Sequence, residues 1–145
     1  MAAQDFKKIL VGVDSSADAL AAFRYAIHRA KTDNAALIIT TILESDDYNV
    51  YQALDKDYVH GEAAELENHI HAYQQLAQQA GIHDVRAVIG EGDPGETIVK
   101  TLIPQYQPDL LIIGAQAKQG LAKHFGSQAS YMAKHAPISV LVIRE

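Results

Sequence analysis

Apolar residues along the chain form two kinds of pattern, short continuous runs and longer stretches with helical spacing. The runs are rich in β-branched and aliphatic residues and occupy residues 8–13, 36–43, 85–89, 109–113 and 138–143. Runs of this length and composition are typical of strands that are covered on both faces, as in a parallel sheet. Between them, apolar positions recur every three or four residues, which predicts helices over about 17–31, 62–79, 94–103 and 127–135.

Small and polar residues mark several boundaries of these helices. Ser15 or Ser16 can cap the first helix through its hydroxyl, and Asp93 can cap the third. Gly81 is expected to end the second helix, because glycine accepts the left-handed conformation of a helix C-terminus. Pro104 is expected to stop the third helix before it, since proline lacks the N–H that a helix interior needs.

The segment 44–58 is the least periodic part of the chain. It is acidic and carries three tyrosines. A connection this long is often functional, but a surface flap packed by its own tyrosines explains the same composition. Both interpretations stay open from the sequence.

Strands and helices alternate along the whole chain, which predicts an α/β fold: a doubly wound five-stranded parallel sheet with helices on both faces. The length of 145 residues suits a single domain, residues 1–145. The strand at 8–13 should be central, because it is apolar on both faces. Such sheets bind ligands at the carboxyl ends of strands where the strand order reverses. Asp14 and Gly114 each follow a strand, so they would face one crevice if those strands are neighbours.

Composition narrows the class of protein. Cysteine is absent, which excludes disulfides and thiolate metal sites and fits a reducing compartment such as the cytoplasm. The net charge of −6 argues against nucleic acid as the main partner. No apolar run approaches the roughly 20 residues of a membrane span. We therefore expect a cytoplasmic domain that binds neither nucleic acid nor membrane.

The basic residues are unevenly distributed. Residues 110–144 contain no Asp or Glu but carry Lys118, Lys123, Lys134 and Arg144, so this segment is +4 and the remainder is −10 in a chain of −6. A helix that opens with Gly126 and Ser127 lies in the same segment. Unpaired N–H groups and the helix dipole favour an anion at such a start. The alternative is that Lys118 and Lys123 are ordinary solvated loop charges.

Metal-binding and catalytic patterns are weak. His69 and His71 are two residues apart, so on a helix they point about 200° apart and cannot share a metal ion. Glu65 and His69 have suitable spacing but no third ligand, and a solvated helix face explains them better. His124 lies in the basic loop, where it could meet phosphate. The chain has neither a Gly-x-Ser-x-Gly elbow nor a P-loop, so no catalytic residue is predicted.

Four segments together resemble the universal stress protein family. They are Lys-Ile-Leu-Val-Gly-Val-Asp-Ser-Ser at 8–16, Glu-Gly-Asp-Pro at 91–94, Pro-Asp-Leu-Leu-Ile-Ile-Gly at 108–114 and His-Ala-Pro-Ile-Ser-Val-Leu-Val-Ile-Arg at 135–144. The resemblance implies the strand order 3-2-1-4-5 and a cytoplasmic homodimer paired through the last strand. Many members bind ATP through a Gly-x2-Gly-x9-Gly-Ser/Thr pattern, and another branch does not.

Carried over by position, the resemblance implies a site for ATP, with or without Mg²⁺. In that site Val13 and Asp14 would meet the nucleoside, Ile42 would flank adenine, and the phosphate positions would be Gly114, Ala117, Gly126 and Ser127. Ala117 replaces the second glycine, and the eleven residues between Gly114 and Gly126 are one fewer than the pattern has. Gln128 stands where the family often has a small apolar residue.

The function expected from this resemblance is an ATP-binding regulatory domain of a stress response. Two alternatives remain open from the sequence. One is a member that does not bind nucleotide and acts through protein contacts, and the other is a slow ATP hydrolase. Retention of ATP separates the first alternative from the expected function, and product formation over hours would support the second.

Overall fold

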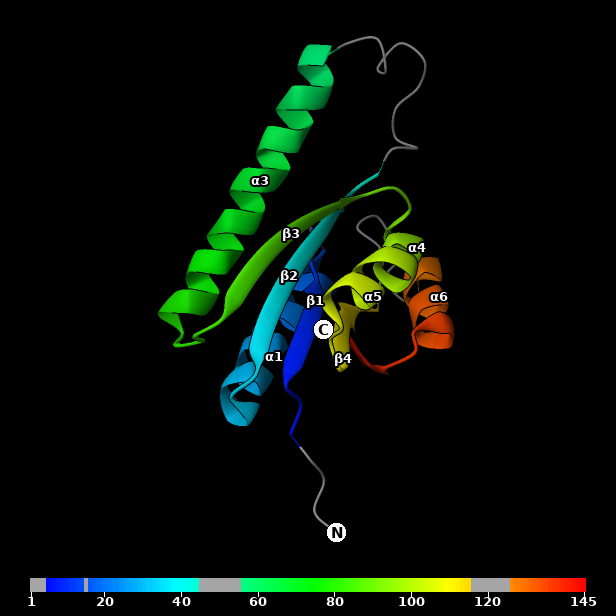
Figure 1. Ribbon diagram of the computed structural model, residues 1–145. Coiled ribbons are helices and arrows are strands. Elements are labelled where there is room, and N and C mark those ends of the chain that lie inside the picture. Colours follow the sequence, from blue (N-terminus) through cyan, green and yellow to red (C-terminus); the bar gives the residue numbers. More distant parts are fainter. Residues whose placement is uncertain (1–4, 15, 45–55, 116–125) are drawn as a thin grey trace.

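The structure is a computed structural model that describes residues 5–14, 16–44, 56–115 and 126–145, with the backbone alone for 56–63. Five parallel strands form one sheet in the order β3-β2-β1-β4-β5 (Figure 1). The strands are β1 (Lys8–Gly12), β2 (Ala36–Leu43), β3 (Val85–Glu91), β4 (Leu110–Gly114) and β5 (Ser139–Ile143). This confirms the predicted fold class, the strand order and the central place of the first strand.

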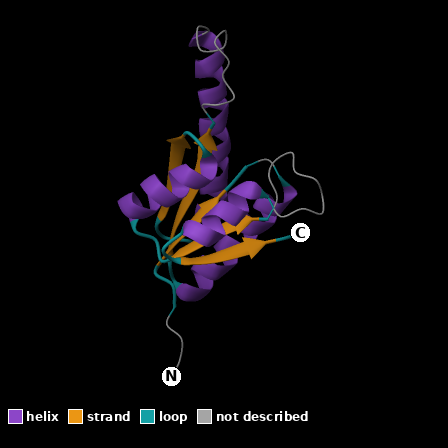
Figure 2. Cartoon of the chain, turned by 90° about the vertical axis from the view of Figure 1, so that its right-hand side faces the viewer, coloured by secondary structure: helices purple, strands orange, loops and turns teal. Residues whose placement is uncertain are grey.

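Helices cover both faces of the sheet (Figures 1 and 2). The helical segments are α1 (Ala17–Asp33), α3 (Lys56–Gln79), α4 (Pro94–Thr97), the π-helical η2 (Ile98–Leu102), α5 (Ile103–Tyr106) and α6 (Ser127–His135). α1 and α3 pack on one face, and α4, η2, α5 and α6 pack on the other. Right-handed crossovers require this division, because the chain moves outward from β1 to β3 and then returns to β4 on the other side of β1.

The core lies on the two sides of β1. Ile9 and Val11 belong to the cluster under α1 and α3, and Leu10 belongs to the cluster under the other helices. All three side chains are 0% exposed, so β1 is buried on both faces as its apolar run predicts.

Local sequence explains most of the element ends. The Ser16 hydroxyl accepts a hydrogen bond from the Ala19 N–H at 3.0 Å and caps α1. Gly81 has a φ of 103°, the left-handed conformation that ends α3. The Asp109 carboxylate accepts from the N–H groups of Lys7 and Lys8 at 2.8 and 3.0 Å, and so fixes the start of β4 beside the start of β1.

Several boundaries differ from the sequence prediction. α3 begins at Lys56, six residues before the predicted start at 62, and β3 runs to Glu91. The helix after Asp93 was predicted to stop before Pro104, and this was wrong, because α5 continues to Tyr106. A π-helical turn precedes the proline, and the Ile103 N–H reaches back to the Ile98 carbonyl. This wider turn shifts the hydrogen-bond pattern at the point where the proline has no N–H to give.

Replacement of Ile9 or Val11 by Asp should unfold the protein. Burying an aliphatic side chain of this size is worth roughly 1.5–3 kcal/mol, and a buried unpaired charge costs more. Ile9→Val is the matched control and should lower the stability by only about 0.5–1.5 kcal/mol. Thermal unfolding measured by circular dichroism checks both. If Ile9→Asp kept the native melting temperature, the assignment of β1 as a buried central strand would be wrong.

Candidate functional site

The strand order reverses between β1 and β4, and the carboxyl ends of these two strands are where such a sheet is expected to hold a ligand crevice; this place is called the crevice below. These two strands pair in parallel, and the chain leaves β1 for α1 on one face and leaves β4 towards α6 on the other. The connections diverge to opposite faces, and in sheets of this topology the space between such strand ends is the usual ligand position. The pairing of β1 with β2 extends to Val13, whose N–H donates to the Thr40 carbonyl at 2.9 Å. The Val13 side chain is buried in the core cluster under α1 and α3.

Asp14 is the exposed residue that follows Val13 in the chain. One of its oxygens, Oδ1, accepts from the Ser16 N–H at 2.7 Å, which holds the side chain at the turn into α1. Within the described part of the chain no hydrogen bond engages its second oxygen. A carboxylate that is fixed through one oxygen can use the other for a hydroxyl or a water molecule.

Gly114 contributes close packing rather than a turn. It is the last residue of β4 rather than the residue after it, and its φ is not positive. A Cβ at this position would lie 2.8 Å from the Ala19 nitrogen and 2.8 Å from the Asp18 carbonyl carbon. Only glycine lets the first turn of α1 approach β4 this closely. The start of α1 is thereby held against the end of β4.

The start of α6 has no side-chain cap. Gly126 is the N-cap residue, with φ −66° and ψ 150°, and its N–H donates to the Ala115 carbonyl at 2.7 Å. The first bond within the helix runs from the Ser130 N–H to the Gly126 carbonyl at 3.0 Å. Among the described residues, no side chain accepts from the N–H groups of this first turn. Together with the exposed Ser127 hydroxyl, they form a donor set suited to an anion.

Ile42 lies on the opposite wall of the crevice. The β1–β2 register pairs Gly12 with Thr40, and its continuation places Ile42 level with Asp14. Ile42 is half-buried, and its Cδ1 atom fills the space where a Cβ on Gly90 would lie, at 2.7 Å. It offers an apolar surface beside the end of β1.

The predicted basic residues do not all contribute. Lys118, Lys123 and His124 lie outside the described residues, as does Ala117. Lys134 is exposed in the last turn of α6, seven residues and about 10 Å from the start of the helix. Lys134 is therefore too far from the start of α6 to contact an anion bound there.

Two features of the crevice were missed by sequence reasoning. Asp18 is buried in the first turn of α1, and its Oδ1 atom accepts from the Glu145 N–H at 2.8 Å, which ties the end of the chain to α1. Gln128 bonds to the start of α4. The sequence signal for Asp18 was an acidic residue in a first helical turn, which the helix dipole already explains. The signal for Gln128 was a polar residue at a family position that is often apolar.

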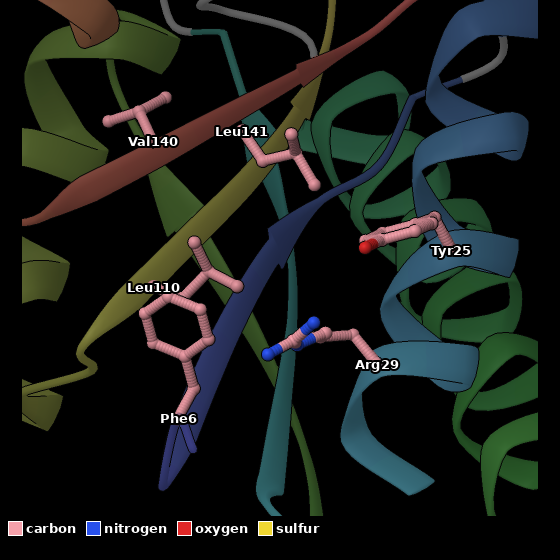
Figure 3. Close-up of a pocket in the computed structure, with 6 residues that line it drawn as sticks. All are labelled: Phe6, Tyr25, Arg29, Leu110, Val140 and Leu141. Atoms are coloured by element: carbon pink, nitrogen blue, oxygen red, sulfur yellow. The ribbon is translucent and has the colours of Figure 1, made fainter. Parts of the chain in front are cut away.

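A separate pocket of about 270 Å³ lies beside β5 and is lined by Phe6, Tyr25, Arg29, Leu110, Val140 and Leu141 (Figure 3). It is near the amino ends of β1 and β4, so it is distinct from the crevice. The Arg29 guanidinium points over the Phe6 ring, 5.4 Å from its centroid, and donates to the Asp33 carboxylate at 2.9 Å. This carboxylate raises the pKa of Arg29 above its ordinary value.

The described residues contain no group of three or more His, Asp or Glu side chains placed to hold a metal ion. Likewise, none of the described helices combines the length and apolar character needed to cross a membrane.

Known proteins resemble this chain in sequence and in fold. A curated Staphylococcus aureus (strain USA300) protein that carries the universal stress protein name is 31% identical over 140 residues, which span 96% of this chain and 84% of that relative. The solved structure of universal stress protein UspA from Lactobacillus plantarum is 31% identical, with a TM-score of 0.86 over 99% of this chain and 100% of the other.

Two more distant structures share the fold. One is a universal stress protein in complex with cAMP, with a TM-score of 0.73 and 23% identity, covering 97% of this chain and 98% of that one. The other is a universal stress protein from Archaeoglobus fulgidus in complex with dAMP, with a TM-score of 0.67 and 18% identity, covering 97% of this chain and 99% of that one. The sequence profile of the Universal stress protein family matches residues 5–144. With this profile across nearly its whole length and relatives above 30% identity, the chain belongs to the universal stress protein family.

Proposed function

We propose that this protein is a cytoplasmic regulatory domain that binds ATP in the crevice between β1 and β4. The observation that carries the proposal is the start of α6, where Gly126 and Ser127 present donors that no described side chain satisfies. Structural relatives in complex with cAMP and dAMP support an adenine nucleotide as the class of ligand.

The proposed pose assigns a part of the nucleotide to each wall. The phosphates lie at Gly126 and Ser127, where the donors and the positive end of the helix dipole meet. The ribose lies at Asp14, through the carboxylate oxygen that its turn does not use. Adenine lies against Ile42, whose half-buried side chain provides the apolar surface, and beside the main chain of Val13. The Asp14 carboxylate can also bind Mg²⁺ through a water molecule of the ion, because carboxylate oxygen is a preferred partner of Mg²⁺.

The alternative, a member that does not bind nucleotide, is favoured by two features of the sequence. Ala117 stands in the second glycine position of the pattern, and the loop is one residue short. An alanine keeps the N–H donor but resists positive φ and the close approach of phosphate. Gly114 and Ala117 are accordingly the weaker phosphate positions in the proposal, and Gly126 and Ser127 are the stronger ones.

Ser127→Ala should weaken ATP binding about 10-fold or more, because a hydrogen bond to a charged oxygen is worth roughly 1.5–3 kcal/mol. Gly126→Val should abolish ATP binding by placing a side chain where phosphate must approach. The φ and ψ of Gly126 are extended and open to any residue, so the valine adds no backbone strain. Calorimetric titration with ATP, AMP and adenosine measures these effects.

Ser130→Ala is the matched control for this experiment. Ser130 is an exposed serine of the same helix, and its N–H already serves the bond to the Gly126 carbonyl. This variant should bind ATP as the wild type does. If the wild type gave neither heat nor a thermal shift with millimolar Mg²⁺-ATP, the alternative without nucleotide binding would be correct.

We also propose that the protein is a homodimer paired through β5. β5 is the edge strand beside β4, and Val140, Leu141, Val142 and Ile143 are only half-buried. The Ile143 carbonyl accepts from Ala115 on the β4 side. Alternation along the strand therefore turns the N–H and C=O groups of Val140 and Val142 outward. An unpaired apolar edge of this kind is a template for a second strand, and a two-fold axis would pair it antiparallel with its copy.

Val140→Pro should convert the dimer to a monomer or an aggregate. The substitution removes an outward N–H that the dimer would use, while the ladder with β4 keeps its bonds. Light scattering gives the mass, and circular dichroism checks that the fold is intact. Leu141→Pro is the contrasting variant, because its N–H faces β4 and its loss should destabilise the monomer itself. A folded dimer from Val140→Pro would place the interface on another surface.

A further inference from the structure

Gln128, the second residue of α6, bonds to the start of α4 with both ends of its side-chain amide. Its Oε1 atom accepts from the Gly95 N–H at 2.7 Å, and its Nε2 group donates to Asp93 Oδ1 at 3.0 Å. Asp93 in turn caps α4, since its Oδ2 atom accepts from the Glu96 N–H at 3.2 Å. Gln128 and the Asp93 cap thus satisfy two N–H groups at the α4 start.

Chemistry fixes the orientation of this amide. The Gly95 N–H can only donate, so the oxygen of Gln128 must face it. An ionised carboxylate can only accept, so the nitrogen of Gln128 must face Asp93. Exchanging the two ends of the amide would place donor against donor and acceptor against acceptor.

The contact is also closely packed. A Cβ at Gly95 would lie 2.7 Å from the Gln128 Oε1 atom and 3.0 Å from Cδ1 of Tyr131. Gly95 is buried, and because it has no Cβ, α6 can approach the start of α4. This arrangement leaves α6 little freedom to slide or rotate at its second residue.

The contacts of Gln128 with Asp93 and Gly95, called the bridge below, join the two walls of the crevice. On one side, the Gly92 N–H donates to the Leu43 carbonyl at 2.9 Å, which ties the turn before α4 to the end of β2 beside Ile42. On the other side, Gly126 and Ser127 directly precede Gln128, and the Gly126 N–H bonds to Ala115 after β4. Through these contacts Gln128 couples the wall with Ile42 to the donor set at the α6 start.

We propose that Gln128 is a positioning residue, which holds the first turn of α6 at the orientation that phosphate binding needs. The inference rests on the proposed nucleotide site, because the donors that it positions are those assigned to phosphate. A preorganised donor set loses affinity when its supporting contacts are removed, since the ligand must then reorder the helix start.

Three variants test this role: Gln128→Glu, Asp93→Asn and the double variant. Gln128→Glu faces the Asp93 carboxylate with a second carboxylate. Asp93→Asn retains a capping residue for α4, because the amide oxygen can still accept from the Glu96 N–H. The NH₂ group of the new side chain then faces the NH₂ group of Gln128, so two donors meet. In the double variant, the new amide at position 93 donates to the new carboxylate at position 128, and that carboxylate still accepts from the Gly95 N–H. The bridge is restored with its donor reversed, and the net charge equals that of the wild type.

Each single variant should weaken ATP binding roughly 10-fold, a typical coupling between contacting groups, and the double variant should recover most of that loss. Adenosine affinity should stay unchanged in all three, because adenosine does not use the α6 donors. A purely electrostatic effect predicts otherwise, since Asp93→Asn removes a negative charge and would strengthen ATP binding.

Calorimetry with ATP and adenosine, alongside urea unfolding of the same four proteins, separates the outcomes. Lower stability with unchanged ATP affinity would overturn the positioning role and leave a merely structural one. Failure of the double variant to recover ATP affinity would overturn the bridge as its cause. If the wild type did not bind ATP, the proposed function would fail. The free energies of unfolding of the four proteins would then still test the bridge. If the effects of the two single variants did not add up to that of the double variant, the bridge would be established, and if they did, it would be refuted.

Discussion

The position of β1 determines the rest of the structure. β1 pairs with β2 on one side and β4 on the other, and its side chains are buried on both faces. Helices must therefore cover both faces, and the connections after β1 and β4 must leave in opposite directions. The crevice with Val13 and Asp14 follows from this topology. So does the close approach of α1 to Gly114, where any side chain would collide with the helix backbone.

Side chains that bind main-chain N–H groups complete this frame. Asp109 joins the starts of β1 and β4, and Asp33 accepts from the Phe6 N–H at 2.9 Å ahead of β1. Asp18 holds Glu145 at the other end of the sheet. Hydrogen bonds to charged acceptors are stronger than neutral ones, so a few such contacts can fix the chain segments that surround a site. The start of α6 differs, because no described side chain accepts from its first N–H groups.

Local pattern was sufficient to predict the fold class, and the family resemblance supplied the strand order. The apolar runs predicted all five strands, and Ser16, Gly81 and Asp93 act at helix ends as expected. Apart from shifted element boundaries, the features that the sequence did not reveal depend mainly on distant residues. Gly114 was expected to follow a strand, but the need for a glycine there comes from α1, nearly a hundred positions earlier in the chain. The Gln128 contacts span 33 and 35 residues, and the contact between Asp18 and Glu145 spans 127. No periodicity or motif reveals such pairs, and the π-helical turn that lets the helix pass Pro104 also has no local signal.

The central claim is that the first turn of α6 holds the phosphates of an adenine nucleotide. Its N–H groups are not bonded within the helix, so in the free protein they should exchange rapidly with deuterated solvent. Hydrogen exchange of the native protein, measured alone, with Mg²⁺-ATP and with adenosine, tests this claim most directly. The account predicts that Mg²⁺-ATP slows exchange at Ser127, Gln128 and Ala129 and that adenosine does not. Unchanged exchange at these three amides under saturating Mg²⁺-ATP, or protection confined to another surface, would contradict it.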